Sequence, residues 1–81
     1  MWYVYIVECT DLSLYTGITL DVDRRVKEHN HSAKGAKSLR YKRPVHLVYS
    51  EKYNSHRDAA RREYEIKQWK REEKRKLITG A

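Results

Sequence analysis

Residues 2–9, WYVYIVEC, are β-branched or aromatic at almost every position, and this run constrains the fold more than any other feature. A strand with one face in water would alternate apolar and polar residues, whereas a continuous apolar run predicts a strand covered on both faces. In a chain of 81 residues, such a strand belongs at the centre of a small sheet. The run is too short for the core of a signal peptide, and no segment reaches membrane-spanning length.

Turn residues and periodicity predict the elements that follow. Thr10 and Asp11 mark a turn, so residues 12–18 are expected to pair with the first strand as a hairpin. Asp21 is expected to cap a helix that runs to about Asn30. A polar, basic loop over residues 31–43 then leads to the second half of the chain.

The second half predicts one strand and two helices. Pro44 opens a strand over residues 45–53, in which Val45, Leu47 and Tyr49 are expected to face inward. Ser55 begins a capping-box-like start for a helix that runs through Trp69. The tail predicts a further short helix that ends at Gly80. The order β-β-α-β-α-α over residues 1–81 predicts one α+β domain, with a small three-stranded, mostly antiparallel sheet flanked by helices.

The net charge of +7 is concentrated in the middle and the C-terminal third of the chain. Residues 31–50 contain no acidic group and five basic ones, namely Lys34, Lys37, Arg40, Lys42 and Arg43. This pattern predicts a contact with the phosphates of a nucleic acid, while a solvated basic surface is the alternative. The single cysteine, Cys9, fits a reducing compartment, and we expect a cytoplasmic protein that does not bind membranes.

The chain has seven tyrosines and no phenylalanine. A core that needed only aromatic bulk could use phenylalanine and avoid placing a hydroxyl group. Tyr5 of the first strand and Tyr15 of the second are expected on one face of the hairpin, opposite or diagonal to each other. The remaining strand and loop tyrosines are interpreted as buried rings with the hydroxyl at the rim; they are Tyr3, Tyr41, Tyr49 and Tyr53.

Arg25 and His29 share a face of the first helix at i, i+4 spacing, close to this tyrosine pair. Gly17 lets backbone or ligand approach closely. A phenol whose pKa is lowered by cations can take a proton from water, and a guanidinium can hold two phosphate oxygens. Together these residues predict phosphate chemistry in an open groove.

Glu63 is the candidate ligand for a divalent cation. It shares a helical stripe with Ala59, Ala60 and Ile66, where a carboxylate is out of place on a purely solvated face. Mg²⁺ takes oxygen ligands and often uses only one or two carboxylates. The alternative is an ordinary carboxylate on the helix surface.

These residues resemble the motifs of the GIY-YIG nuclease family. Tyr3-Val4-Tyr5 matches the first triplet, of which only Tyr5 is kept, and Tyr15-Thr16-Gly17 matches the second. The family's arginine falls on Arg25, the histidine or tyrosine one turn later on His29, and the glutamate of the later helix on Glu63. The segments 17–30 and 62–69 are similar to the small stand-alone bacterial branch of the family.

The resemblance implies a metal-dependent phosphodiesterase, as in DNA repair or processing, that uses one Mg²⁺ or Mn²⁺ ion. Tyr5 would activate the attacking water with help from His29, and Tyr15 would bind the water or the phosphate. Arg25 would hold the scissile phosphate, Glu63 would hold the ion, and Lys67 would add a phosphate contact. DNA is the expected partner.

Two other functions are compatible with the sequence. The characterised nucleases usually carry a separate targeting domain, and these 81 residues contain none. The alternatives are a weak, non-specific nuclease, a nuclease to which a protein partner supplies specificity, and a protein that only binds nucleic acid. The same fold could also serve as a basic nucleic-acid-binding module with little or no turnover. A basic protein associated with RNA or the ribosome would share the charge, but it would require the site residues to be accidental.

Overall fold

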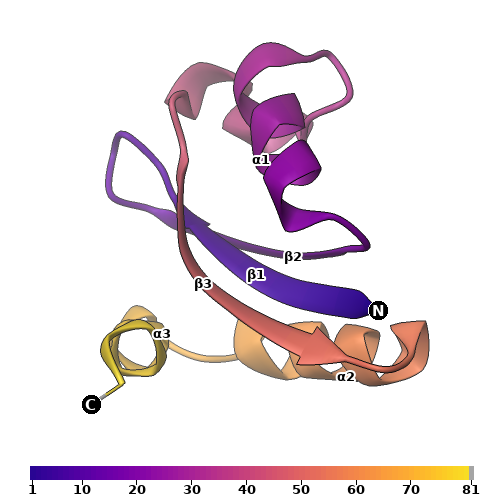
Figure 1. The fold of residues 1–81 in the computed structure, drawn as a ribbon. Helices are drawn as coiled ribbons and strands as arrows, with labels where there is room; N and C mark the ends of the chain where they lie inside the picture. Colours follow the sequence, from indigo (N-terminus) through magenta and orange to yellow (C-terminus); the bar gives the residue numbers. More distant parts are fainter. Residues whose placement is uncertain (81) are drawn as a thin grey trace.

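The structure, a computed structural model, describes residues 1–80. The strand β1 (Trp2–Glu8) lies between β2 (Leu14–Thr19) and β3 (His46–Tyr53), and both pairings are antiparallel. The predicted central position of the first strand is therefore confirmed. The helix α1 (Val22–His31) and the 3-10 helix η1 (Lys37–Lys42) lie on one side of this sheet (Figure 1). The helices α2 (His56–Lys67) and α3 (Arg71–Thr79) lie on the other side.

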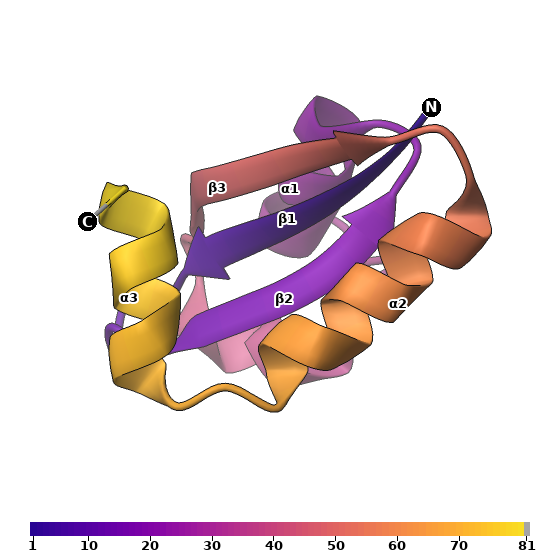
Figure 2. The same ribbon diagram turned by 90° about the horizontal axis from the view of Figure 1, so that it is seen from below.

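Alternate residues of β1 belong to two separate cores, which explains why the strand is apolar on both faces. Tyr5 and Val7 pack with Leu39 and Val45 on the α1 side. On the other face, Val4 and Ile6 pack with α2 residues. Seen from that side, α2 runs alongside β2 and α3 covers the end of the sheet (Figure 2). The predicted α+β fold, with the order β-β-α-β-α-α, is confirmed.

The predicted helix ends agree closely with the structure. Asp21 caps α1 by accepting the N–H of Arg24, and Ser55 caps α2 by accepting the N–H of Asp58. Gly80 ends α3 in the left-handed conformation, with φ of 76°. No helix within residues 1–80 is long and apolar enough to cross a membrane.

Several local predictions need correction. The hairpin strands span 2–8 and 14–19, not 2–9 and 12–18, because residues 9–13 form the turn. The segment predicted as a loop over 31–43 contains η1. Tyr41 on η1 is 93% exposed, so the prediction of a buried ring is wrong.

A bulge in β3 changes which of its side chains face inward. Ile6 pairs with Tyr49 and Val7 pairs with Leu47, which leaves Val48 as the extra residue. Val48 and Tyr49 both pack against the α2-side core. Leu47 is 41% exposed, so its predicted inward position is wrong, and the period-2 alternation fails at the bulge.

Candidate functional site

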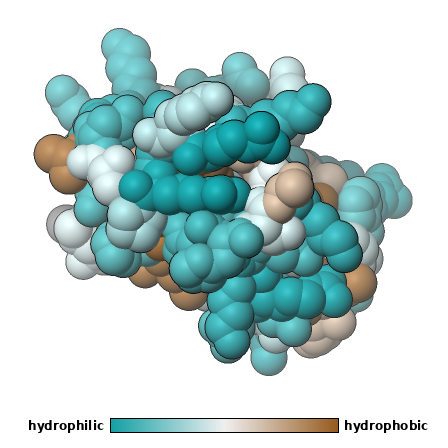
Figure 3. Space-filling view, turned by 90° about the horizontal axis from the view of Figure 1, so that it is seen from above, coloured by the Kyte–Doolittle hydropathy of each residue, from teal (hydrophilic) through white to brown (hydrophobic). Residues whose placement is uncertain are grey.

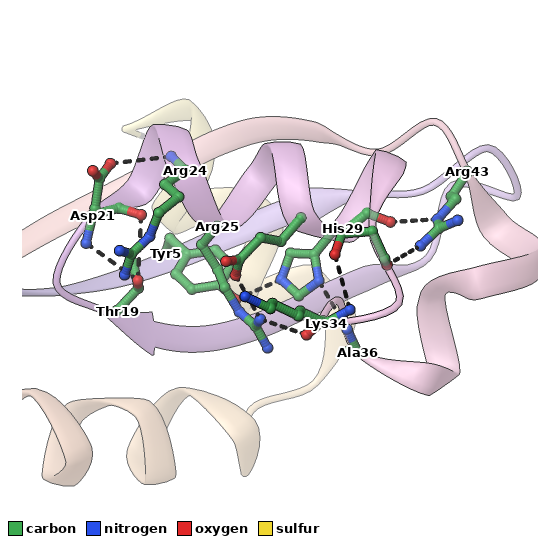
Figure 4. Close-up of polar contacts among 11 residues, drawn as sticks. Tyr5, Thr19, Asp21, Arg24, Arg25, His29, Lys34, Ala36 and Arg43 are labelled. Carbon is green, nitrogen blue, oxygen red and sulfur yellow. Dashed lines mark hydrogen bonds and ion pairs between the residues drawn. The ribbon is translucent and has the colours of Figure 1, made fainter.

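Four of the predicted site residues meet where α1 packs on the β1–β2 hairpin. Tyr5 pairs with Gly17, and Val7 pairs with Tyr15, so the two tyrosines are diagonal neighbours on the α1 face. Their ring centroids are 6.5 Å apart. The His29 ring lies 5.9 Å from the Tyr5 ring and 5.4 Å from the Tyr15 ring. The hairpin register and the i, i+4 spacing on α1 thus bring together groups from three elements. Figure 4 shows Tyr5, Arg25 and His29 of this cluster.

Gly17 makes room for the end of the Tyr5 side chain. A Cβ atom at position 17 would lie 2.6 Å from the Tyr5 hydroxyl oxygen and 2.8 Å from Cζ. The phenol therefore lies directly over the backbone of β2, which is an edge strand of the sheet. This close approach is the physical reason for a glycine next to the tyrosine motif.

His29 is fully buried at 0% exposure, and both of its ring nitrogens have polar neighbours. Nε2 lies 2.7 Å from the Tyr5 hydroxyl oxygen, and Nδ1 accepts the backbone N–H of Ala36 at 3.1 Å. Burial, reinforced by the cation of Arg25, lowers the pKa of His29 to about 4. The imidazole is therefore neutral at neutral pH.

This burial predicts that the free energy of unfolding falls as the pH drops from 6.5 towards 4. The unfolded chain takes up a proton at His29 near pH 6.5, whereas the folded chain does so only near pH 4, so the unfolded state binds more protons between these values. The expected slope is about 0.7 kcal/mol per pH unit near pH 6.5, where the unfolded imidazole is half protonated, and approaches about 1.4 kcal/mol per pH unit near pH 5. Urea denaturation at several pH values between about 5 and 6.5 measures this slope. The range is chosen because it lies above the pKa values of ordinary carboxylates.

The matched controls are His29→Gln, which should remove this slope, and His31→Gln, an exposed neighbour that should keep it. A wild-type slope that is unchanged in His29→Gln would show that the imidazole is not the group responsible.

Tyr5 does not have the lowered pKa that the sequence suggested. Burial raises the pKa of its phenol to about 12, with further increases from Tyr15 and from the carboxylate of Glu63, against the opposing effect of Arg25. The cation is present as expected, but the loss of water around a side chain that is only 1% exposed outweighs it.

Arg25 lies at the open side of this cluster, with 28% of its side chain exposed. Nη1 donates to the carboxylate of Glu28 at 3.0 Å and to the backbone carbonyl of Lys34 at 2.8 Å. Partial burial lowers the pKa of Arg25, but hydrogen bonds to Glu28 and Tyr5 outweigh that effect and raise it. The guanidinium therefore stays charged and fixed in place.

Glu63 lies in the other layer of the fold, on the opposite side of the sheet from α1. It lies on α2, its side chain is 21% exposed, and Lys67 lies 3.4 Å from its carboxylate. The carboxylate is close enough to contribute to the raised pKa of Tyr5. Within residues 1–80 no three His, Cys, Asp or Glu side chains group so as to hold a metal ion. One half-buried carboxylate is a donor that suits Mg²⁺, which keeps several of its waters.

The five cations of the middle segment do not share one role. Lys34, Lys37 and Arg40 are exposed. The face of the molecule seen from above is mostly hydrophilic (Figure 3). Lys42 is 3.5 Å from the carboxylate of Asp11, so one of the five cations has a counter-charge from outside the segment. Arg43 donates to the backbone carbonyls of His29 and Ser32 and so holds the end of α1. Its contact with phosphate stays a prediction.

Two surface hollows lie away from these residues. One, of about 430 Å³, lies beside the start of α1 and is lined by Tyr3, Leu20 and Leu47 among others. The other, of about 360 Å³, lies beside Tyr53 and α2. Neither hollow is lined by any of the five predicted site residues.

Sequence reasoning missed the part that Gly35 and Ala36 play. The backbone N–H of Ala36 binds the His29 ring, and Gly35 packs directly on the backbone of α1. A glycine in a basic segment was the only signal, and it indicated no more than a turn.

Comparison with known proteins identifies the family. Residues 1–76 match the GIY-YIG catalytic domain. A UPF0213 protein of Desulfotalea psychrophila is 53% identical over 80 residues, which cover 99% of this chain and 73% of that protein. A UPF0213 protein of Staphylococcus aureus is 53% identical over 76 residues, covering 94% of this chain and 92% of that protein.

A solved structure agrees with this family. The solution NMR structure of a UPF0213 protein from Bacillus halodurans gives a TM-score of 0.62 at 49% identity, over 98% of this chain and 84% of that chain. The chain belongs to the GIY-YIG family. Its relatives are small bacterial proteins that carry the UPF0213 name.

Proposed function

We propose that this protein is a metal-dependent endonuclease that hydrolyses phosphodiester bonds in nucleic acid, with DNA as the expected substrate. The observation that carries the proposal is the meeting of the buried Tyr5–His29 pair with Arg25, while Glu63 acts on the same phenol from α2. Membership of a nuclease-like family supports the same chemistry.

Each polar side chain of the cluster has a role in this proposal. As the phenolate, after its own proton has left to solvent, the Tyr5 oxygen accepts a proton from the attacking water as general base. Arg25 uses Nη1 to hold Glu28 and the carbonyl of Lys34 and also contacts Tyr5, so its remaining N–H groups would bind the oxygens of the scissile phosphate. The Tyr15 hydroxyl, on the same face, orients the water or the phosphate.

Glu63 would hold the divalent cation. Its carboxylate is a hard oxygen donor that pairs with Lys67 at 3.4 Å. Lys67 is 49% exposed and would add a contact to a phosphate oxygen. When bound, such an ion supplies charge stabilisation for the phosphate and for the leaving oxygen.

Arg25 provides a test of the proposal, because one substitution removes both its charge and its planar guanidinium and another removes only the guanidinium. Arg25→Ala is expected to weaken both binding and cleavage. Arg25→Lys keeps the charge but loses the planar fork, so it should recover binding more than cleavage. Measuring the dissociation constant and the single-turnover rate of both variants checks this. Full cleavage by Arg25→Ala would contradict the assigned role.

The exposed cations of the middle segment are expected to bind backbone phosphates without reading bases. Replacing Lys34, Lys37 and Arg40 by alanine together should reduce the slope of log K against log salt by about 0.7 to 0.9 per lost contact. Affinity should fall to a similar extent for all sequences, as measured by fluorescence anisotropy at several salt concentrations.

The control is a triple variant of three exposed basic residues elsewhere in the chain, Lys52→Ala, Arg57→Ala and Lys76→Ala, which changes the net charge by the same amount. Equal losses in both variants would indicate that only the overall charge matters.

A basic binding module without turnover is the second candidate. It is favoured by the pKa of about 12 for Tyr5, which leaves little phenolate at neutral pH in the free protein. Tight binding without cleavage in the presence of Mg²⁺ or Mn²⁺ would support this second function.

A further inference from the structure

The two nitrogens of His29 have different partners, and this difference determines where its proton lies. The backbone N–H of Ala36 points at Nδ1 over a distance of 3.1 Å. A backbone amide can only donate, so Nδ1 must be the acceptor and carries no proton. A neutral imidazole has one proton, which must therefore be on Nε2.

The partner of Nε2 is the Tyr5 hydroxyl oxygen, 2.7 Å away. With its proton on Nε2, His29 donates to this oxygen, and the Tyr5 proton must point elsewhere. His29 then has no free lone pair towards Tyr5 and cannot take up the phenolic proton. It can, however, stabilise the phenolate once the proton has left by another route.

The contact from Ala36 depends on Gly35. A Cβ atom at position 35 would lie 2.5 Å from the carbonyl oxygen of Glu28 and 2.6 Å from Cα of His29. These neighbours are helix backbone and cannot move aside, so a side chain would push the segment away from α1. Glycine therefore allows the N–H of Ala36 to reach the ring (Figure 4).

Two arginines hold the same segment from outside. Arg25 donates to the carbonyl of Lys34 at 2.8 Å, and Arg43 donates to the carbonyl of Ser32 at 2.7 Å. Arg25, which is proposed to bind phosphate, thus also fixes the segment that contacts His29.

The charges around the ring favour the same neutral state. Arg25 disfavours a second proton on His29, Glu28 favours it, and Arg43 disfavours it to a smaller extent, while Tyr15 contributes the edge contact between the rings. Burial adds to the effect of the two cations and lowers the pKa of His29 to about 4.

We propose that residues 32–36 fix His29 as the tautomer protonated on Nε2, so that His29 is a positioning residue that donates to Tyr5 and never accepts its proton. The consequence for the reaction rests on the proposed function, in which Tyr5 is the general base. The assignment of the tautomer does not depend on that function.

Long-range ¹H–¹⁵N correlation spectra of the full chain labelled with ¹⁵N-histidine test the tautomer directly. At pH 7, His29 should show an unprotonated Nδ1 and a protonated Nε2, and His29→Gln assigns the signals by their loss. The exposed residues His31, His46 and His56 provide the averaged pattern for comparison. A proton on Nδ1 of His29, or an averaged pattern, would overturn the inference.

Gly35→Ala tests whether the close packing of residues 32–36 on α1 fixes the tautomer. The variant should shift the His29 signals towards the averaged pattern, and an unchanged pattern in a folded Gly35→Ala protein would show that this segment does not fix the tautomer. Ala36→Gly keeps the N–H and should keep the wild-type pattern. If Gly35→Ala does not fold, the wild-type spectrum alone decides.

An isosteric pair tests the consequence for cleavage. Gln at position 29 can donate to the Tyr5 oxygen, whereas ionised Glu can only accept. His29→Gln is expected to cleave at least about tenfold faster than His29→Glu, which corresponds to about 1.4 kcal/mol. Equal or faster cleavage by His29→Glu would overturn the donor role. If the wild type cleaves nothing but shows the expected tautomer, only the proposed function fails.

Discussion

Replacing Glu63 by glutamine is expected to abolish metal-dependent cleavage while leaving the fold and nucleic-acid binding intact. The amide keeps the shape of the side chain but removes the charge that would hold the ion. A bound metal supplies several kcal/mol of charge stabilisation, so we expect a loss of about a thousandfold or more in the single-turnover rate. The ion pair with Lys67 is half-exposed and should contribute little to the free energy of unfolding.

Glu65→Gln is the matched control, because it makes the same change of charge on the same helix at a carboxylate that pairs with Arg62. It should cleave like the wild type. Binding by Glu63→Gln should be unchanged or slightly tighter, since a negative charge near the phosphate has gone. Cleavage by Glu63→Gln at the wild-type rate would show that the ion is held elsewhere or that a contaminant cuts.

Tyr5→Phe is expected to reduce cleavage by about 10²- to 10⁴-fold, the usual contribution of a general base. The substitution removes only the hydroxyl and keeps the ring that packs over Gly17. Tyr41→Phe is the matched control, because it removes a hydroxyl from a ring that is 93% exposed on η1. Single-turnover rates of the two variants, compared with the wild type, measure the difference.

The pH profile gives Tyr5 a second signature. Burial raises the pKa of its phenol to about 12, so the phenolate fraction rises with pH throughout the working range. If the phenolate is the base, kcat/KM should increase about tenfold per pH unit from neutral pH upwards without reaching a plateau. Neutral His29 would give no such rise, because its pKa of about 4 leaves it deprotonated already. A profile that is flat above neutral pH would contradict the role of Tyr5.

The fold was largely predictable because its strongest signals are local. The apolar run of β1 identifies a central strand, and Asp21 and Ser55 mark helix starts by their capping side chains. The bulge at Val48 was not predictable, since register depends on the partner strand and not on the bulged segment alone. The short helix η1 has too few residues to show a helical period.

The candidate site residues were recognisable by type and spacing, but their electrostatics were not. Arg25 predicted a lowered pKa for Tyr5, whereas burial raises it, and depth of burial emerges only when α1 packs on the sheet. The structural role of Arg43 and the N–H of Ala36 were equally hidden. Both are hydrogen bonds with backbone groups, and every residue has such groups, so the sequence does not indicate which of them will be used.

The central claim is tested most directly by the wild-type protein on a panel of labelled single-stranded, double-stranded and branched nucleic acids. Each substrate is incubated with Mg²⁺ or Mn²⁺, with and without excess chelator, and the products are separated by size. We predict cleavage of at least one substrate that requires the metal, stops with chelator and is lost in Glu63→Gln. Tight binding to the panel with no cleavage under any metal condition would contradict the nuclease function.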